Sequence, residues 1–354
     1  MAPATVEMPV AVLDVKDSEQ IHATLRGHAD PVSSVAFAPD GKALATCSSR
    51  GEVKLWDVDS AKERRTLSQS GTALGLAFRP DGRTLAMSWF EPFGKDDKTL
   101  TGSYRGTDVK GYRGGVKLWD AESGKERGVL QRQSPRGVTH IALSGDGKTL
   151  AAVEAWREND VKDIKRGVAL WDIESRKVVH TLNDTAFALA FAPDGKTLAL
   201  SNSEGVMLWD VAARRQCGKL GGDKTYVRQL VFSPDGKILA GCDYQGTVHL
   251  WDVAGGKEKA ALQHGDSQTA SCLAFAPDGK TLAVGVGPRS SQDIEPGEVV
   301  LWDTATSKKR LTLRGHIGNV LSLAYSADGA FLASGGADKT VKLWNIGPRA
   351  ASQR

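Results

Sequence analysis

Cysteine is scarce in this chain, and the four residues present show none of the spacings that cross-links or metal sites use. Cys47, Cys217, Cys242 and Cys272 lie far apart inside apolar or strand-like runs. Zinc sites and small disulfide-rich domains pair their cysteines closely in sequence. The seven histidines show no ligand spacing either. We therefore expect reduced cysteines that serve packing, with no metal and no cofactor.

Long apolar runs and a strong charge imbalance are also missing. No run of about 18 uninterrupted apolar residues occurs, and the start, MAPATVEMPV, has no basic cluster before an apolar segment. The sequence therefore predicts neither membrane spanning nor secretion, and a cytoplasmic location is the default expectation. The formal net charge is only +4 over 354 residues. This weak field gives no reason to expect a nucleic-acid partner.

Two short motifs occur instead, seven times each and in alternation. One is an apolar pentapeptide, such as VKLWD at Val53, that ends in Trp-Asp or Trp-Asn. The other surrounds a tight turn, usually Pro-Asp-Gly, as in AFAPDGKALA from Ala36. Proline presets φ, aspartate bonds its own backbone and glycine adopts positive φ, so each copy predicts a hairpin of strands a and b. The pentapeptide predicts strand c, and a short run ending in leucine predicts strand d.

Units of about 40 residues with four strands and a terminal Trp-Asp resemble the WD-repeat family of β-propellers. The resemblance covers Ile21 to Asn345 and implies an all-β, seven-bladed β-propeller with four antiparallel strands in each blade. The near-identical turn segments are similar to those of bacterial members. A large indole on each strand c would fill the space between blades. These tryptophans are Trp56, Trp119, Trp171, Trp209, Trp251, Trp302 and Trp344.

The ring is expected to close through the start of the chain. Six of the seven tryptophans are followed by a strand d, whereas the chain ends soon after Trp344. The segment IHATLRGH from Ile21 matches KRLTLRGH from Lys309. We therefore expect residues 21–25 to be strand d of the seventh blade. The alternative, an open stack of hairpins, would need capping repeats that the sequence lacks.

The domain boundaries follow from this scheme. We expect a partly disordered N-terminal extension at 1–20, a single propeller at 21–345 and a C-terminal tail at 346–354. Within the extension, Val10 to Val15 resembles a decayed strand c for which the seven-bladed ring has no place.

The family resemblance also implies a hydrogen-bonded tetrad of histidine, serine or threonine, aspartate and tryptophan. It maps fully only onto His316, Ser334, Asp338 and Trp344, in the seventh blade. The first blade has Arg50 where the aspartate is expected. We therefore expect the complete network only in the blade where the ring closes without a covalent link.

The loops between strands b and c differ strongly in length. From the last leucine of strand b to the tryptophan of strand c the chain runs 34 residues in blade 2, 21 in blade 3 and 20 in blade 6, but only 11 or 12 elsewhere. All b to c loops lie at one end of the blades. One rim should therefore carry three insertions, whereas the opposite rim is uniform and reads as scaffold.

The insertions of blades 2 and 3 contain aromatic and arginine residues, the types that dominate binding hot spots. We expect them in loops without a core to fill, and long loops on a rigid scaffold commonly carry function. The alternative is that they fold back and only order their own loops. The candidate residues are Trp89, Phe90, Phe93, Tyr104, Arg105, Tyr112, Arg113, Trp156 and Arg157.

The resemblance implies a non-catalytic platform that binds a protein or peptide, and we expect binding at the rim with the long b to c loops of blades 2, 3 and 6. By itself the chain should be a monomer, without a membrane or nucleic-acid partner. The alternative is an enzyme or small-molecule binder at the mouth of the central channel. That alternative would require converging ionisable side chains on the links between strands d and a, where the sequence is small and polar.

Overall fold

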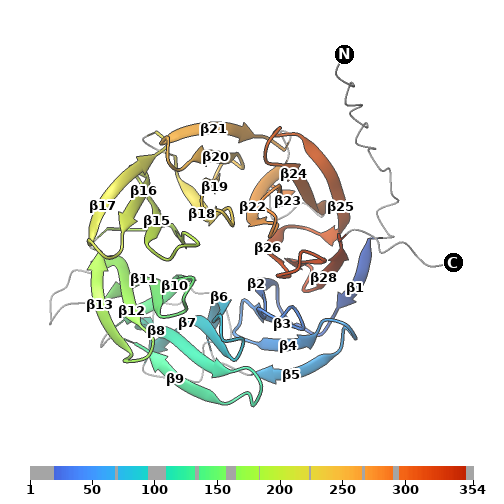
Figure 1. Cartoon of the computed structure of the whole chain (residues 1–354). Helices are drawn as coiled ribbons and strands as arrows, with labels where there is room; N and C mark the ends of the chain where they lie inside the picture. Colours follow the sequence, from blue (N-terminus) through green and yellow to red (C-terminus); the bar gives the residue numbers. More distant parts are fainter. Residues whose placement is uncertain are drawn as a thin grey trace.

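The computed structural model of the chain describes residues 20–67, 71–94, 109–131, 135–156, 165–182, 184–222, 225–264, 268–289 and 295–347. These residues form seven antiparallel sheets of four strands each. The sheets are arranged as blades around a ring, with the first strand of each hairpin innermost (Figure 1). The predicted seven-bladed, all-β propeller is therefore confirmed.

The blades follow the chain order, and each is given from its inner to its outer strand. Blades 1 and 2 are β2 (Val32–Phe37), β3 (Ala43–Ser48), β4 (Val53–Asp57), β5 (Glu63–Leu67), and β6 (Thr72–Phe78), β7 (Thr84–Gly94), β8 (Val109–Asp120), β9 (Glu126–Leu130). Blades 3 and 4 are β10 (Pro135–Leu143), β11 (Thr149–Trp156), β12 (Lys165–Asp172), β13 (Lys177–Leu182), and β14 (Ala188–Phe191), β15 (Thr197–Asn202), β16 (Gly205–Asp210), β17 (Arg215–Leu220). Blades 5 and 6 are β18 (Val227–Phe232), β19 (Ile238–Asp243), β20 (Val248–Asp252), β21 (Lys257–Leu262), and β22 (Gln268–Phe275), β23 (Thr281–Pro288), β24 (Pro296–Asp303), β25 (Lys309–Ile317). Blade 7 is β26 (Val320–Tyr325), β27 (Phe331–Gly336), β28 (Val341–Asn345) and β1 (Ile21–Leu25).

The turn between strands a and b has the geometry that its sequence predicts. In blade 1 the Gly41 amide donates to the Ala38 carbonyl at 2.9 Å, and the Lys42 amide donates to Asp40 Oδ1 at 2.9 Å. Gly41 has a φ of 71°, and the glycines at the same position of the other blades lie between 66° and 71°. Glycine adopts this backbone conformation readily because it has no β-carbon. Each repeat therefore starts with a hairpin whose register is set locally.

The aspartate of each Trp-Asp pair holds the next turn, between strands c and d. Asp57 Oδ1 accepts the amide and the hydroxyl of Ser60, both at 2.8 Å, and Arg64 Nη2 donates to Asp57 Oδ2 at 2.5 Å. The hydrogen bonds from Ser60 and Arg64 hold the pKa of the Asp57 carboxyl far below its ordinary value. Asp120 of blade 2 is bonded in the same way. The uniform rim is thus made of short turns with their own hydrogen bonds.

The apolar core lies between neighbouring blades. Trp56 of blade 1 is 3% exposed and packs in one cluster with Leu25 and Val341 of blade 7. Trp344 of blade 7 is fully buried and packs with Leu301 of blade 6. Replacing a tryptophan in such a core by alanine lowers the free energy of unfolding by about 3 to 5 kcal/mol. The repeated indole therefore joins each sheet to the one before it.

The first strand of the chain completes the last blade. β1 pairs antiparallel with β28, with Ile21 opposite Trp344 and Leu25 opposite Val341. Figure 1 shows this blue strand beside the red C-terminal strands. The predicted closure is confirmed. The extension and the tail expected at 1–20 and 346–354, including the segment from Val10 to Val15, lie outside the described residues except for positions 20, 346 and 347.

Side chains of the innermost strands also connect the blades. The Val35 amide of β2 donates to Ser322 Oγ of β26 at 3.0 Å, and the Leu273 amide of β22 donates to Gln229 Oε1 of β18 at 2.7 Å. Blades 7 and 1, and blades 5 and 6, are joined next to the channel in this way.

The described part of the chain contains no helix long and apolar enough to cross a bilayer.

Candidate functional site

The closing blade contains the hydrogen-bonded tetrad that the sequence indicates. His316 Nδ1 lies 2.9 Å from Asp338 Oδ2, and His316 Nε2 lies 2.8 Å from Ser334 Oγ. The indole Nε1 of Trp344 donates to Ser334 Oγ at 2.8 Å. Burial tends to raise the pKa of Asp338, but the hydrogen bond and the charge of His316 lower it well below its ordinary value. The network connects strands b and c of blade 7 to the end of β25, the outer strand of blade 6.

Blade 1 contains an equivalent network that the sequence comparison missed. His28 Nδ1 lies 2.8 Å from Glu52 Oε2, and His28 Nε2 lies 2.7 Å from Thr46 Oγ1. The indole Nε1 of Trp56 donates to Thr46 Oγ1 at 2.9 Å. The expectation that only the closing blade has a complete network is therefore wrong. The longer side chain of Glu52, two positions after Arg50, reaches the histidine in place of an aspartate.

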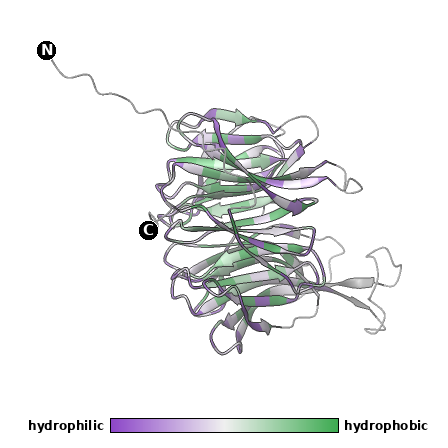
Figure 2. Ribbon diagram, turned by 90° about the vertical axis from the view of Figure 1, so that its right-hand side faces the viewer, coloured by the Kyte–Doolittle hydropathy of each residue, from purple (hydrophilic) through white to green (hydrophobic). Residues whose placement is uncertain are grey.

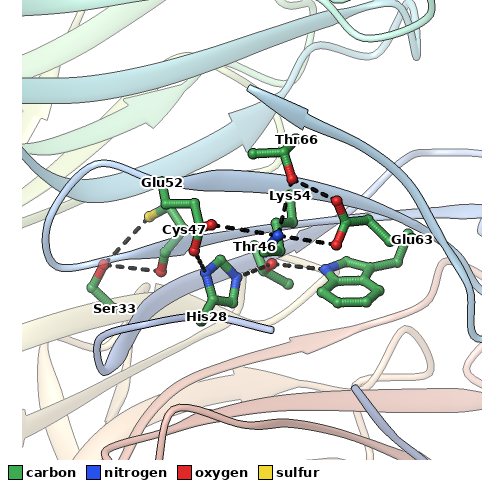
Figure 3. A network of polar contacts seen from close by, with 9 residues as sticks. His28, Ser33, Thr46, Cys47, Glu52, Lys54, Glu63 and Thr66 are labelled. Atoms are coloured by element: carbon green, nitrogen blue, oxygen red, sulfur yellow. Dashed lines mark hydrogen bonds and ion pairs between the residues drawn. The ribbon is translucent and has the colours of Figure 1, made fainter. Parts of the chain in front are cut away.

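The blade 1 network extends further through a buried lysine (Figure 3). Lys54 Nζ lies 3.4 Å from Glu52 Oε1 and 3.0 Å from Glu63 Oε2, and it donates to Thr66 Oγ1 at 2.9 Å. The Lys54 side chain is only 8% exposed. Burial lowers the pKa of His28 although Glu52 opposes the shift. The network therefore ties strands b, c and d of the blade into one unit, which identifies it as structural.

Blade 6 has lost this network but kept its donors. Trp302 Nε1 and both ring nitrogens of His264 are buried, with no hydrogen-bond partner among the described residues. The two rings meet edge to face, with centroids 5.3 Å apart. Burial lowers the pKa of His264 to about 4. Register places Val284 where blades 1 and 7 have Thr46 and Ser334.

Val284→Thr is therefore expected to raise the free energy of unfolding by about 1 kcal/mol, because the new hydroxyl can accept the Trp302 N–H. The change keeps the side-chain volume, and urea denaturation measures the effect. Val286→Thr, at a fully buried position on the same strand, is the matched control. It should lower stability by about 1 to 2 kcal/mol, as expected for a buried hydroxyl without such a donor. Equal losses of stability in both variants would contradict the idea that a hydroxyl at position 284 accepts the Trp302 N–H.

The three long b to c connections form strands for part of their length. β7 and β8 remain paired as far as Gly94 and Val109, β11 and β12 as far as Trp156 and Lys165. The corresponding pair in blade 6 also exceeds the usual length, with eight residues in each strand. Seen from the edge, the ring carries its longest strand pair on one side only (Figure 2). The inserted residues nearest the propeller are therefore ribbons that project from one rim.

Two of the expected rim residues lie on strand β7, and one of them belongs to the core. Trp89 is 6% exposed and packs in the cluster between blades 1 and 2. Phe90 is half-buried, and a β-carbon on Gly137 of blade 3 would lie only 2.5 Å from Phe90 Cβ. A β-carbon on Gly114 would lie 2.3 Å from the Trp89 carbonyl oxygen. The expectation that Trp89 and Phe90 lie in a loop without a core is wrong, because β7 continues and its glycine neighbours allow close packing.

The other candidate residues divide into two groups. Phe93, Tyr112, Arg113 and Trp156 lie on strands β7, β8 and β11, and their side chains are outside the described part of the structure. Tyr104, Arg105 and Arg157 lie outside the described residues. The structure therefore places the backbone of the first group on the long ribbons of blades 2 and 3.

The described residues lack a ligand set for a metal ion, and the polar side chains of the inner strands have contacts of their own. No cluster of three or more histidine, cysteine, aspartate or glutamate residues in them is placed to hold a metal ion. Polar side chains of the inner strands bond to the neighbouring blade, as Ser34 Oγ does with the Leu76 amide at 3.1 Å. These side chains stabilise the ring.

A family model described as "WD domain, G-beta repeat" matches residues 19–57, 214–252 and 307–345. Each match begins at an outer strand d and ends with strand c of the next blade. The sequence repeat is thus displaced by one strand from the structural blade. This displacement is the reason that β1 must return to blade 7.

Several curated proteins are similar to the chain over most of its length. The WD repeat-containing protein WDS homolog of Arabidopsis thaliana is 23% identical over 287 residues, which cover 78% of this chain and 49% of that protein. The guanine nucleotide-binding protein subunit beta of Arabidopsis thaliana is 23% identical over 335 residues, which cover 92% of this chain and 83% of that protein. Protein groucho of Drosophila melanogaster is 28% identical over 244 residues, which cover 66% of this chain and 31% of that protein.

The alignments span only 49%, 37% and 36% of the first three relatives, so much of each relative lies outside the similarity. What is shared is the repeat itself. WD repeats are matched in three places and the same four-stranded blade forms seven times around a closed ring, so this chain contains WD repeats and folds as a seven-bladed β-propeller.

Proposed function

We propose that the chain is a non-catalytic scaffold that binds a protein or peptide on the rim with the long b to c connections. The observation that supports this most directly is the asymmetry of the ring. Blades 2, 3 and 6 extend their middle strands at one rim, whereas the opposite rim consists of short turns held by their own hydrogen bonds. A rigid ring with elongated ribbons on one side suits recognition of another macromolecule.

The names of the relatives agree with a role in assemblies. One similar protein is a subunit of a guanine nucleotide-binding protein, and another is a transcriptional corepressor. A subunit acts through contacts with other chains, and we extend that mode of action to this chain. Its monomeric state and its cytoplasmic location stay predictions.

The ribbons are held firmly at their bases, which favours binding. Phe90 of blade 2 packs against Gly137 of blade 3. In blade 6 the Gly318 amide donates to the Glu295 carbonyl at 2.8 Å, and Pro296 lies opposite Ile317. A surface that is already ordered loses less conformational entropy when a partner binds. These contacts support the rim as a preorganised binding surface.

Replacing residues 91–113 by Asn-Gly tests the proposal. The two residues would join Phe90 to Gly114, which lie opposite each other, in a tight hairpin turn that this dipeptide favours. The shortened protein should melt close to the parent, because Trp89 and Phe90 keep their packing. Affinity capture from the source organism, followed by mass spectrometry, should then lose partners that the parent retains.

Glu122→Lys provides the control for this experiment. Glu122 is exposed on the short turn between β8 and β9, at the opposite rim of the same blade. The charge change should leave the set of captured partners unchanged. An identical set of partners from the shortened protein and the parent would rule out the ribbon of blade 2 as a binding element.

A further inference from the structure

Large apolar side chains are exposed at few places in the described structure. Val179, Tyr226, Tyr244 and Ile317 are 44%, 40%, 59% and 59% exposed. Val179 lies on an outer strand, β13, but the other three lie at or beside links of the rim with the long ribbons. Exposed tyrosines on a soluble surface are enriched at binding sites. They stand on a different part of this rim from blades 2 and 3.

The two tyrosines flank the same end of one hairpin. β18 begins at Val227 and β19 ends at Asp243, and these two residues pair with each other. Tyr226 directly precedes this pair and Tyr244 directly follows it, so they are neighbours across the antiparallel strands. Phe187, from the link that enters blade 4, lies against Tyr226 with ring centroids 5.9 Å apart. Three aromatic rings thus extend along the rim from blade 4 to blade 5.

Two arginines contact the same turn. The Arg228 guanidinium carbon lies 5.9 Å from the Tyr244 ring centroid. Arg289, from the b to c connection of blade 6, donates through Nη2 to the Gln245 carbonyl at 3.1 Å. Arg228 therefore stands next to the exposed ring of Tyr244, and Arg289 is bonded to the backbone of the following residue. We call Tyr226, Tyr244, Arg228 and Arg289 the Tyr–Arg surface.

The acids nearest to this surface are already bonded to other groups. Asp243 Oδ2 lies 3.2 Å from His249 Nε2, and Asp243 Oδ1 accepts the Thr247 amide at 2.8 Å. Glu258 Oε1 lies 2.8 Å from His249 Nδ1. His249 stacks on Trp251, with ring centroids 5.4 Å apart and an interplanar angle of 12°. These contacts hold both carboxylates in the body of blade 5.

Among the described residues, no carboxylate balances the charge of the two arginines. No carboxylate of the described residues lies within ion-pair distance of Arg228 or Arg289. Arg228 donates one terminal nitrogen to the Ala270 carbonyl, and its Nε is buried without a partner in the described part of the chain. A guanidinium that has no carboxylate partner among the described residues and lies beside an exposed tyrosine ring fits an acidic ligand with an apolar neighbour.

We propose that the Tyr–Arg surface binds an acidic segment of a partner protein, with a glutamate or aspartate carboxylate on the arginines and an adjacent apolar side chain on the tyrosines. The proposal rests on the proposed function, since it uses the same rim. One Arg228 nitrogen already donates to the Ala270 carbonyl, so few of its N–H groups remain for a ligand. A planar carboxylate with one charge needs fewer donors than a phosphate, which has three acceptor oxygens and nearly two charges.

Arrays of short peptides test this chemistry directly. Each peptide carries a central Leu-Glu pair in random flanks, and matched sets carry Leu-Gln, Leu-Lys or Leu-phosphoserine. The purified full chain should bind the Leu-Glu set about tenfold more strongly than the Leu-Gln set, as expected for a lost charged hydrogen bond. Equal binding of the Leu-Gln set would overturn the proposal, and stronger binding of the phosphoserine set would overturn the choice of a carboxylate.

Substitutions then locate the binding site. Tyr244→Ser and Arg289→Gln change exposed side chains, so the fold should persist, and each should weaken Leu-Glu binding about tenfold. Arg228→Lys keeps the charge but removes the planar fork, and should weaken it as well. Val179→Ser removes another exposed apolar side chain, on β13, and should have no effect. Unchanged binding by Tyr244→Ser and Arg289→Gln together would refute the site.

The protein with residues 91–113 replaced separates this proposal from the preceding one. It keeps the Tyr–Arg surface, so it should bind the Leu-Glu peptides like the parent. Loss of captured partners together with retained peptide binding would support both proposals. If the shortened protein keeps both its partners and its peptide binding, only the proposal that the ribbon of blade 2 binds partners is contradicted. If peptide binding is absent, only the proposal for the Tyr–Arg surface is contradicted.

Discussion

Deletion of residues 1–25 should abolish cooperative folding of the ring. The deletion removes β1, the fourth strand of blade 7, and exposes the edge of β28. It also removes the buried Leu25, the half-buried Ile21 that covers Trp344, and the Gln20 carbonyl that accepts the Asn345 amide at 2.9 Å. The two apolar side chains alone contribute about 2 kcal/mol each. With the strand hydrogen bonds, the loss approaches the 5 to 15 kcal/mol by which domains are typically stable.

Thermal unfolding followed by circular dichroism measures this effect, and two comparisons make it specific. Deletion of residues 1–19 leaves β1 intact and should preserve the melting transition. A synthetic peptide covering residues 19–30, added to the shortened protein, should restore part of the transition, because β1 pairs with blade 7 through non-covalent contacts. A melting temperature unaffected by removal of β1 would mean that ring closure contributes little to stability.

Asp338→Ala should be the most destabilising single change among the polar residues of the two tetrads. It leaves the buried His316 without its acceptor and frees the amides of Ile317 and Thr340, which Asp338 accepts at 3.1 and 3.0 Å. Removing one partner of such a network typically costs about 2 to 4 kcal/mol. Glu52→Ala should cost less, because Glu52 is 31% exposed and Lys54 keeps Glu63. Urea denaturation at neutral pH compares the two variants.

The stability of the parent should also depend on Asp338 at low pH. The folded-state pKa of Asp338 lies below its ordinary value, so its contribution is present above the unfolded pKa of about 4. That contribution is lost as the pH falls through the folded-state pKa. Asp338→Asn removes the titration, and its stability should fall less steeply below about pH 4 than that of the parent. Parallel pH profiles of the two proteins would show that Asp338 is not the titrating group.

Most of the fold could be predicted because its signals are local. The Pro-Asp-Gly turns, the Trp-Asp pairs and the leucine at the end of each strand d recur at regular spacing. Each of these signals depends on a few consecutive residues, whose backbone preferences act in the same way in every repeat. The closure by residues 21–25 followed because seven strands c required seven strands d. The blade count and the closing strand were therefore accessible from the sequence.

The binding rim was predicted less completely, for reasons that involve distance in space. Trp89 and Phe90 looked like loop residues because the insertion begins beside them, yet β7 continues and Gly137 of blade 3 lets it pack closely. The Tyr–Arg surface went unnoticed because its members come from β18, the end of β19 and the connection of blade 6. No sequence motif links residues that far apart.

The sequence by itself determined the seven repeated sheets, their order and the return of the first strand to the last blade. Turn chemistry and strand pattern act between neighbouring residues, so they can be read along the chain. Only the tertiary structure decided that Glu52 completes the network of His28, that Trp89 is buried and that Arg228 and Arg289 contact the same turn, at Tyr244 and Gln245. These outcomes depend on side-chain reach and on packing between blades, which are set by the closed ring.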